Sequence, residues 1–215
     1  MSSTVRDPAS FRDPSGFVFH EKGRVRRAVT DQGLAHARAV RATGLIDRLI
    51  AAGRLLPEEE VREPFEGRED VRMILEHPTI PFISYPYEWP FRLLQSAALL
   101  HLDIQLEALD AAVMLTDATA YNVQFVGAQP VFIDHLSFRP YVEGELWAGH
   151  RQFCDQFLHP LLLESLAGVP FQSWYRGSVE GIPVQHLAPL LRVRHTLNWK
   201  VLVNVVLPAR VQRLA

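Results

Sequence analysis

One stretch in the middle of the sequence limits the possible folds more than any other: residues 91–113 contain neither glycine nor proline. Four apolar residues in this stretch are spaced like one face of an α-helix: Leu102, Leu106, Leu109 and Val113. Because no helix-breaking residue interrupts this spacing, the stretch predicts a single long helix. Any fold proposed for the chain must accommodate that helix.

Extended segments are predicted on both sides of the helix. Before it, Ile80–Glu88 places aromatic residues among prolines, which predicts a strand that leaves into a rigid crossover. After it, apolar runs at Tyr121–Phe125 and Pro130–Asp134 flank Gly127, which predicts two strands joined by a turn. Helical spacing returns at 147–166.

The N-terminal part of the chain predicts a hairpin followed by a helix. Phe17–Phe19 and Val25–Val29 are β-prone runs separated by a polar connection that contains glycine, which predicts a β-hairpin. Apolar residues recur at helical spacing over 33–56, which predicts a helix broken at Gly44. Residues 57–72, rich in Glu, Arg and Pro, predict an acidic surface connection.

Composition and motif content exclude several classes of protein. With 48% hydrophobic and 21% charged residues, the sequence is globular rather than disordered. Its single cysteine, Cys154, excludes an internal disulfide. No two glycines are separated by one residue, so the dinucleotide fingerprint and the glycine-rich SAM loop are absent. The Walker A, His-Glu-x-x-His and Gly-x-Ser-x-Gly motifs are absent as well.

Net charge and apolar content predict where the protein acts. A net charge of −2 predicts no general attraction to nucleic acid or to an anionic membrane. The apolar runs are too short to span a membrane, and the N-terminus lacks the apolar region of a secretory signal. We therefore expect a cytoplasmic protein with neither nucleic-acid nor membrane partners.

One constellation carries recognisable chemistry. Asp117 is followed by four residues and then Asn122, and Asp134 ends the predicted strand pair. This arrangement resembles the catalytic core of protein-kinase-type folds, in which a second Asp after a short hairpin binds magnesium. The resemblance implies that Asp117 is the catalytic base and that Asn122 and Asp134 hold Mg²⁺ beside ATP.

The same resemblance implies an α+β, protein-kinase-like fold with two lobes. Residues 1–90 would form a reduced small lobe, made of the β-hairpin and the helix, together with the hinge. Residues 91–215 would form a mainly helical large lobe that carries the catalytic-loop-like segment. The residues expected to contact the cofactor are Arg26 and Arg27, in the second hairpin strand, and Glu88, at the hinge.

Several positions depart from the kinase pattern. Leu115 stands where kinases usually carry histidine, and Leu136 stands where a glycine is expected after the magnesium-binding Asp. The small-lobe lysine is missing, because Lys22 falls in the hairpin turn, and arginine is not a conservative replacement for it. Glu58–Glu60 is either an acidic partner for that arginine or a solvated run of charge.

A second resemblance covers nearly the whole chain. Residues 80–141, above all 82–89, 117–125 and 132–134, resemble the N-terminal region of bacterial proteins named class I SAM-dependent methyltransferases. In those proteins a methyltransferase domain that carries the SAM loop follows this region. The resemblance implies a kinase-like accessory domain without the methyltransferase domain expected downstream, so SAM would bind only to such a separate domain.

Several functional hypotheses follow. The first is a phosphotransferase that uses Mg²⁺ and ATP on a small molecule or sugar, which retention of Asp117, Asn122 and Asp134 favours. The second is a non-catalytic module that binds a nucleotide or a partner, which the missing lysine and glycine loop favour. Methyl transfer by this chain itself is disfavoured because it lacks a SAM loop. A local interpretation also stays open, in which the three polar residues serve only a turn and strand ends.

The C-terminal part of the sequence predicts an interface. Residues 176–215 hold six basic residues and one acidic residue, and the apolar run 199–207 lies among them. An apolar run near a chain end must be covered, since large exposed apolar patches are uncommon on soluble monomers. The cover would be a methyltransferase domain or a second copy of this chain. The alternative is a last strand or helix that packs on its own core.

Overall fold

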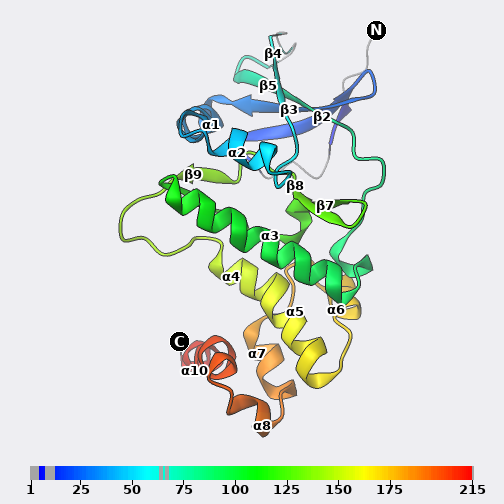
Figure 1. The fold of residues 1–215 in the computed structure, drawn as a ribbon, viewed down its shortest axis with the longest axis vertical. Helices are drawn as coiled ribbons and strands as arrows, with labels where there is room; N and C mark the ends of the chain where they lie inside the picture. The colour runs from blue at the N-terminus through cyan, green and yellow to red at the C-terminus, as the bar shows by residue number, and fades with distance from the viewer. Residues whose placement is uncertain (1–4, 8–12, 63–64, 66–67, 215) are drawn as a thin grey trace. The chain divides into compact units, whose positions relative to one another are not determined.

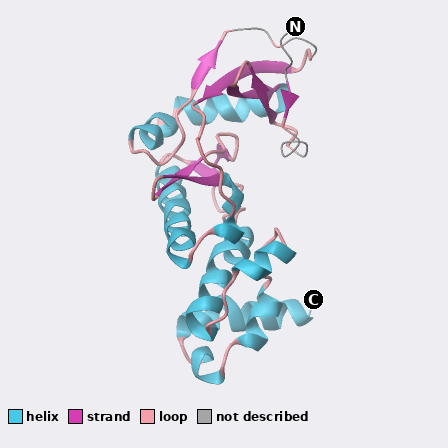
Figure 2. Cartoon of the chain, turned by 90° about the vertical axis from the view of Figure 1, so that its right-hand side faces the viewer, coloured by secondary structure: helices cyan, strands magenta, loops and turns pink. Residues whose placement is uncertain are grey.

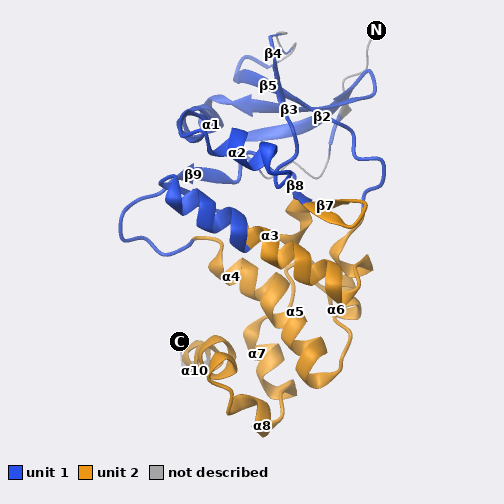
Figure 3. Ribbon diagram, viewed as in Figure 1, with its two compact units in different colours: residues 1–83, 102–116, 131–147 blue, residues 84–101, 117–130, 148–215 orange. Residues whose placement is uncertain are grey.

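The computed structural model of the chain describes residues 5–7, 13–62, 65 and 68–214. It divides into two compact units, between which the chain passes several times (Figure 3). Unit 1 comprises residues 1–83, 102–116 and 131–147, and unit 2 comprises residues 84–101, 117–130 and 148–215. Antiparallel strands and helices together make this an α+β protein.

Unit 1 contains a five-stranded sheet with the strand order β1-β2-β3-β5-β4 (Figure 1). Every neighbouring pair of strands in it is antiparallel. The strands are β1 (Val5–Arg6), β2 (Gly16–Glu21), β3 (Arg24–Thr30), β4 (Glu59–Val61) and β5 (Val71–His77). The sheet therefore joins the N-terminal strands to two strands that come later in the sequence.

The predicted β-hairpin is confirmed as β2 and β3. Its register pairs Glu21 with Arg24, which leaves Lys22 and Gly23 as a two-residue turn. The φ angle is 50° at Lys22 and 76° at Gly23, the left-handed backbone that two-residue hairpin turns favour. The glycine in the polar connection is thus a requirement of the turn.

Successive residues of a strand point to opposite sides of a sheet, so each strand contributes side chains to both faces. Both faces of this sheet bury apolar side chains. One face buries Phe17, Phe19, Ala28 and Ile74. The other buries Val29, Met73 and Leu75, and is packed by Leu34 and Ala37 of helix α1 (Asp31–Ala42). A short helix, α2 (Leu45–Ala51), follows after Gly44, whose φ of 70° confirms the predicted break.

The sequence patterns missed β4 and β5 and placed a strand too late. The segment predicted as a surface connection over 57–72 does expose Glu59 and Glu60, but it is more than a connection, because it contains β4 and the start of β5. Its residues 63–64 and 66–67 lie outside the described residues. The strand predicted at Ile80–Glu88 is wrong, because this segment holds only the 3₁₀ turn Pro86–Glu88. Its prolines cannot donate to a strand ladder, whereas β5 pairs on both edges.

The long central helix is confirmed as α3 (Phe91–Asp110), which contributes to both units. It ends before Val113, which lies in strand β6 (Val113–Leu115). The leucines that revealed the helix are exposed: Leu102 by 37%, Leu106 by 63% and Leu109 by 41%. Its buried side chains include Leu94, Ala97, Ile104 and Ala108. The spacing therefore identified the helix but not its packed face.

Two pairs of strands follow α3. β6 pairs antiparallel with β9 (Phe138–Pro140). Between them in the sequence, β7 (Val123–Val126) and β8 (Gln129–Phe132) form a two-stranded sheet, which confirms the predicted strand pair. Gly127 has a φ of 63° in the connecting turn.

Unit 2 is mostly helical (Figure 2). The helix predicted at 147–166 is confirmed from His150, as α4 (His150–Phe153), the π-helical turn Cys154–Leu158, α5 (His159–Leu162) and the π-helical turn Leu163–Ala167. The chain continues through α6 (Gln172–Gly177), α7 (Val184–Leu187), the 3₁₀ turn Ala188–Leu190 and α8 (Val193–Thr196). It closes with α9 (Trp199–Val201), the π-helical turn Leu202–Val206 and α10 (Leu207–Leu214). None of the described helices combines the length and the apolar character needed to cross a membrane.

Candidate functional site

Asp134 follows β8 in unit 1 and is held by three groups of its own chain. Its Oδ1 lies 2.7 Å from Nη1 of Arg27, on β3. The backbone N–H of Leu136 donates to Oδ1 over 3.2 Å, and the Ser137 hydroxyl donates to Oδ2 over 2.6 Å. Burial opposes ionisation of Asp134, but Arg27 and the Ser137 hydrogen bond outweigh it and lower its pKa below the ordinary 3.8. Asp134, whose side chain is 16% exposed, is therefore a largely buried carboxylate anion with a cation at its side.

A second carboxylate, which the sequence analysis did not single out, approaches the same guanidinium. Asp13 Oδ2 lies 3.9 Å from Nη1 of Arg27, and Asp13 Oδ1 accepts the Ser15 N–H over 2.8 Å. Burial and the charge of Asp134 raise the pKa of Asp13 above the ordinary 3.8, against the lowering effect of its hydrogen bonds and Arg27. In the sequence, Asp13 is recognisable only as part of a turn-forming Asp13-Pro14 pair. Such a pair does not predict contact with an arginine far away in the chain.

Arg26 and Arg27 face different groups, as neighbours on a strand must. The Arg26 guanidinium is buried and pairs with Glu21 over 2.6 Å and with Glu76 over 2.9 Å. It lines a shallow cavity of about 520 Å³ whose other lining residues are Arg24, Glu59, Glu60, Val61, Arg62 and Glu76. Of the two arginines expected to contact a cofactor, Arg27 is the one paired with Asp134.

Glu58 is buried, so the expectation of a solvated charge run is wrong for this residue. Its side chain is 5% exposed, forms an ion pair with Arg41, and lies 2.7 Å from Nδ1 of His135. Burial opposes ionisation of Glu58, yet His135 and Arg41 lower its pKa below the ordinary 4.5. His135 Nε2 faces the Leu56 carbonyl oxygen at 2.8 Å. This cluster fixes the backbone directly after Asp134.

Asp117 begins a loop in unit 2 that ends at Asn122. Asp117 Oδ1 accepts the N–H of Thr119 over 3.1 Å. This is the hydrogen bond within a turn that is expected if Asp117 has only a structural role. The loop closes in the 3₁₀ turn Ala120–Asn122, where the Asn122 N–H donates to the Thr119 carbonyl over 3.2 Å. Asn122 then leads directly into β7.

Two glutamines of the α4 region hold this loop. Gln152 Oε1 accepts the Ala118 N–H over 2.8 Å. Gln156 Oε1 accepts both the Ala120 N–H, over 2.8 Å, and the Thr119 hydroxyl, over 2.9 Å. The sequence analysis missed both residues, because a glutamine one helical turn from another carries no signal of a loop far away in the sequence.

We expect Gln156→Leu to lower the free energy of unfolding by about 2 kcal/mol, because it leaves the buried Ala120 N–H and the half-buried Thr119 hydroxyl without their acceptor. It should also speed amide hydrogen exchange at Ala120. Gln152→Leu, which removes one acceptor from a less buried place, is the matched variant and should cost about half as much. Urea unfolding and exchange measurements check both values; equal effects of the two variants would contradict this account.

Glu88 has a local role in unit 2. Its Oε2 accepts the Tyr85 N–H over 2.8 Å and so caps the turn Pro86–Glu88. The segment before it is tied to β7, because the Ser84 N–H donates to Gln124 Oε1 over 3.0 Å. Glu88 was expected to contact the cofactor, and its side chain is engaged in this cap.

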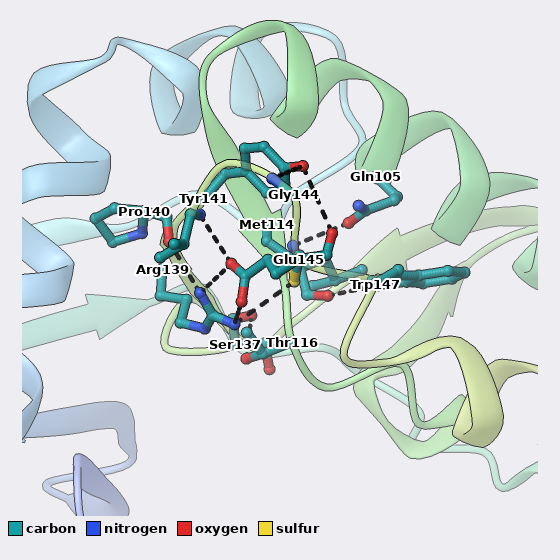
Figure 4. A network of polar contacts seen from close by, with 12 residues as sticks. Gln105, Met114, Thr116, Ser137, Arg139, Pro140, Tyr141, Gly144, Glu145 and Trp147 are labelled. Carbon is teal, nitrogen blue, oxygen red and sulfur yellow. Dashed lines mark hydrogen bonds and ion pairs between the residues drawn. The ribbon is translucent and has the colours of Figure 1, made fainter.

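A polar network in unit 1 fixes the residues just before Asp117 (Figure 4). Leu115 donates its N–H to Gln105 over 2.9 Å and accepts from the Trp147 indole over 2.6 Å. The Thr116 N–H donates over 2.7 Å to the carbonyl of Ser137, the residue whose hydroxyl binds Asp134. One residue, Ser137, therefore bonds both Asp134 and the immediate neighbour of Asp117.

The loop after β9 contributes further hydrogen bonds to the same network. Arg139 pairs with both carboxylate oxygens of Glu145, at 2.6 and 2.7 Å. Glu145 also accepts the Val142 N–H over 2.8 Å, and the Arg139 and backbone hydrogen bonds lower its pKa to about 2. This pair holds the path of the chain from β9 to Trp147.

The chain has a relative among known proteins, although no protein-family profile matches the sequence. The chain is similar to nodulation protein NoeA of Rhizobium meliloti (strain 1021), with 46% identity over 211 residues. The similarity covers 96% of this chain and 44% of NoeA, so the chain spans less than half the length of that relative.

Proposed function

We propose that this chain is a protein-kinase-like domain that binds a magnesium nucleotide and transfers a phosphoryl group to a small molecule or a sugar. The order of elements supports this: an antiparallel sheet with α1 between β3 and β4, then α3, the loop Asp117–Asn122, and a strand pair ending at Asp134. In protein kinases the same order places a strand cation and a metal-binding carboxylate in one site. The observation that carries the proposal is the Arg27–Asp134 ion pair.

The roles proposed for the residues follow from their chemistry. Asp117 would accept the proton of the attacking hydroxyl, as a carboxylate at the start of the loop can. Asn122 and Asp134 offer oxygen ligands of the kind that Mg²⁺ prefers, and the metal would neutralise phosphate charge. Arg27 would take the place of the missing lysine and face the phosphates. Among the described residues no three His, Cys, Asp or Glu side chains form a metal-binding group, so the proposed set depends on the Asn122 amide.

A non-catalytic nucleotide-binding module is the second candidate, and one observation favours it. The Asp134 carboxylate already accepts from Arg27, Leu136 and Ser137. A metal would therefore have to compete with a guanidinium for Oδ1. In this candidate the nucleotide, or a protein partner, binds without phosphoryl transfer.

Association with a methyltransferase is part of the same proposal. More than half of NoeA lies outside the part that matches this chain, which leaves room in such a protein for a further domain. SAM would bind to that domain, because this sequence lacks the glycine-rich loop. We also propose a cytoplasmic location, where ATP is available as the phosphoryl donor.

The test is a thermal-shift titration followed by a phosphoryl-transfer assay. Mg-ATP at about 100 times its Kd should stabilise the folded chain by about 2.7 kcal/mol, which raises Tm by several degrees. Asp134→Asn should abolish the shift, while Asp47→Asn, an exposed carboxylate on α2, should preserve it.

Three outcomes separate the candidates. A shift together with ATP hydrolysis or sugar phosphorylation that Asp117→Asn abolishes supports the phosphotransferase. A shift without turnover supports the non-catalytic module. Equal Tm values with and without Mg-ATP would refute both nucleotide-binding candidates.

A further inference from the structure

The C-terminal helical segment from Trp199 to Val211 has apolar residues on two faces. Val201, Val205 and Ala209 are at most 4% exposed and pack against the chain itself. Four apolar residues spaced four apart stay exposed: Trp199 by 68%, Val203 by 49%, Leu207 by 46% and Val211 by 66%. We call these four residues the tail face. A helix that is apolar on both sides is normally buried on both sides, so the tail face lacks a partner.

The tail face has a basic border. Lys200 and Arg210 are exposed along it, and residues 181–215 contain five basic residues and no acidic one. Because the whole chain has a net charge of −2, the rest of it is negatively charged. A symmetric contact between two tail faces would bring like charges together. The partner that fits is an apolar surface with an acidic border.

The chain itself carries such a surface on α3. Four leucines lie exposed along one side of this helix: Leu99 by 55%, Leu102 by 37%, Leu106 by 63% and Leu109 by 41%. We call them the α3 face. Asp103 and Asp110 are exposed four residues after Leu99 and Leu106, which makes them neighbours on the helix surface.

The charges around the α3 face are partly balanced. Arg54 pairs with Glu107 over 2.8 Å and reaches Asp103 over 3.8 Å, and Arg48 reaches Glu107 over 3.6 Å. Asp110 completes the acidic border at the end of the helix. Around the α3 face, Asp103, Glu107 and Asp110 stand against Arg48 and Arg54, which leaves one net negative charge. The border is acidic overall and opposite in sign to that of the tail face.

We propose that the tail face of one copy of this chain docks on the α3 face of a second copy. The two faces match in length, because at about 1.5 Å per residue the tail face spans about 18 Å and the α3 face about 15 Å. Each presents four apolar side chains, and their borders differ in charge. A contact between unlike faces is heterologous: it closes into a pair when both copies exchange tails, and otherwise extends into a chain of copies.

The experiment measures mass by light scattering across a range of protein concentrations. We expect the wild-type protein to form a dimer or larger species as concentration rises. Val203→Glu, which breaks the tail face, and Leu106→Glu, which breaks the α3 face, should each leave monomers. Leu146→Glu changes a side chain that is 91% exposed but belongs to neither face, and should associate like wild type. Circular dichroism confirms that all variants fold, as exposed positions allow.

Mixing the two blocked variants gives the decisive result. Val203→Glu retains its α3 face and Leu106→Glu retains its tail face, so an equimolar mixture should form a one-to-one complex although each variant alone stays monomeric. A tail-to-tail dimer would be blocked by Val203→Glu alone and not restored by mixing, and this would overturn the proposal. A wild-type chain that stays monomeric at every concentration would also overturn it, and would leave the tail face to a further domain or a lipid surface.

Discussion

Replacing Arg27 by methionine should lower the free energy of unfolding by about 3 kcal/mol at neutral pH, because it leaves a buried carboxylate without its cation. Asp134 is 16% exposed, and its Oδ1 lies 2.7 Å from the guanidinium. Asp13 loses the same counter-charge, since it lies 3.9 Å from Arg27. The two carboxylates would then face each other without the cation between them.

The double variant Arg27→Met, Asp134→Asn separates the lost charge from lost packing. The asparagine Oδ1 can still accept from the Leu136 N–H, and its Nδ2 can donate to the Ser137 hydroxyl oxygen, so the second substitution should recover about 2 kcal/mol of the loss. The penalty in the single variant should also shrink in acid, where Asp134 can take up a proton. Urea unfolding of the four proteins in the cycle measures both effects; losses that simply add would show that the ion pair contributes nothing to stability.

The same cycle distinguishes a structural ion pair from a ligand site. If Asp134 can bind Mg²⁺, removal of Arg27 frees it for the metal, and magnesium chloride alone should then stabilise Arg27→Met more than wild type. The double variant should show no such response. Equal responses of all four proteins to magnesium would mean that the carboxylate serves the fold only.

The elements that local patterns predicted are those whose causes are local. The β2–β3 hairpin depends on a two-residue turn at Lys22–Gly23, and the break between α1 and α2 depends on the positive φ of Gly44. α3 depends on an uninterrupted helical spacing. Each of these features is determined by residues only a few positions apart, so the sequence carries the signal directly.

The parts that were missed depend on distant pairing. β5 is a short apolar run, Met73–Leu75, flanked by charge, and it becomes a strand because β3 and β4 pair with it on either edge. Ile80–Glu88 looks more extended in sequence, but its prolines cannot donate to such a ladder. Pairing partners, rather than composition, decide between these two segments.

In the candidate site too, features set by nearby residues could be predicted and contacts between distant residues could not. Asp117, Asn122 and Asp134 could be named from spacing, because a loop and a strand pair are local features. Their supports could not be: Asp13 meets Arg27 from the β1–β2 connection, and Gln156 meets the loop from a helix beyond β9. Such contacts between separate elements leave no pattern in a single sequence.

Acid should destabilise this protein strongly before the carboxylates of Asp134 and Glu58 are protonated. His77 and His101 are both buried, and burial is the main reason that the pKa of each falls from 6.5 to about 4. The neighbouring His135 adds to the lowering of the pKa of His77, and backbone hydrogen bonds only partly oppose the lowering of the pKa of His101. The folded protein therefore keeps both imidazoles neutral at a pH where the unfolded chain protonates them.

The sign and size of the effect follow from proton linkage. For a base whose folded pKa is lowered, the unfolded chain binds more protons below pH 6.5, so stability falls as pH falls. With one pKa unit equal to about 1.36 kcal/mol, each histidine should cost about 2 kcal/mol by about pH 5. Asp134 and Glu58 contribute little in this window, because their lowered pKa values delay their protonation to lower pH.

Substitution of each histidine in turn measures how much of the stability lost in acid depends on it. His77 belongs to unit 1 and His101 to unit 2, so separate unfolding of the units would make each histidine report on its own transition. His77→Gln and His101→Gln should each remove about one proton from the uptake on unfolding between pH 6.5 and 5, even where they lower stability at neutral pH. His36→Gln, on the exposed side of α1, is the control. If uptake is the same in all four proteins, the two buried imidazoles are protonated in the folded state, and burial does not exclude their charge.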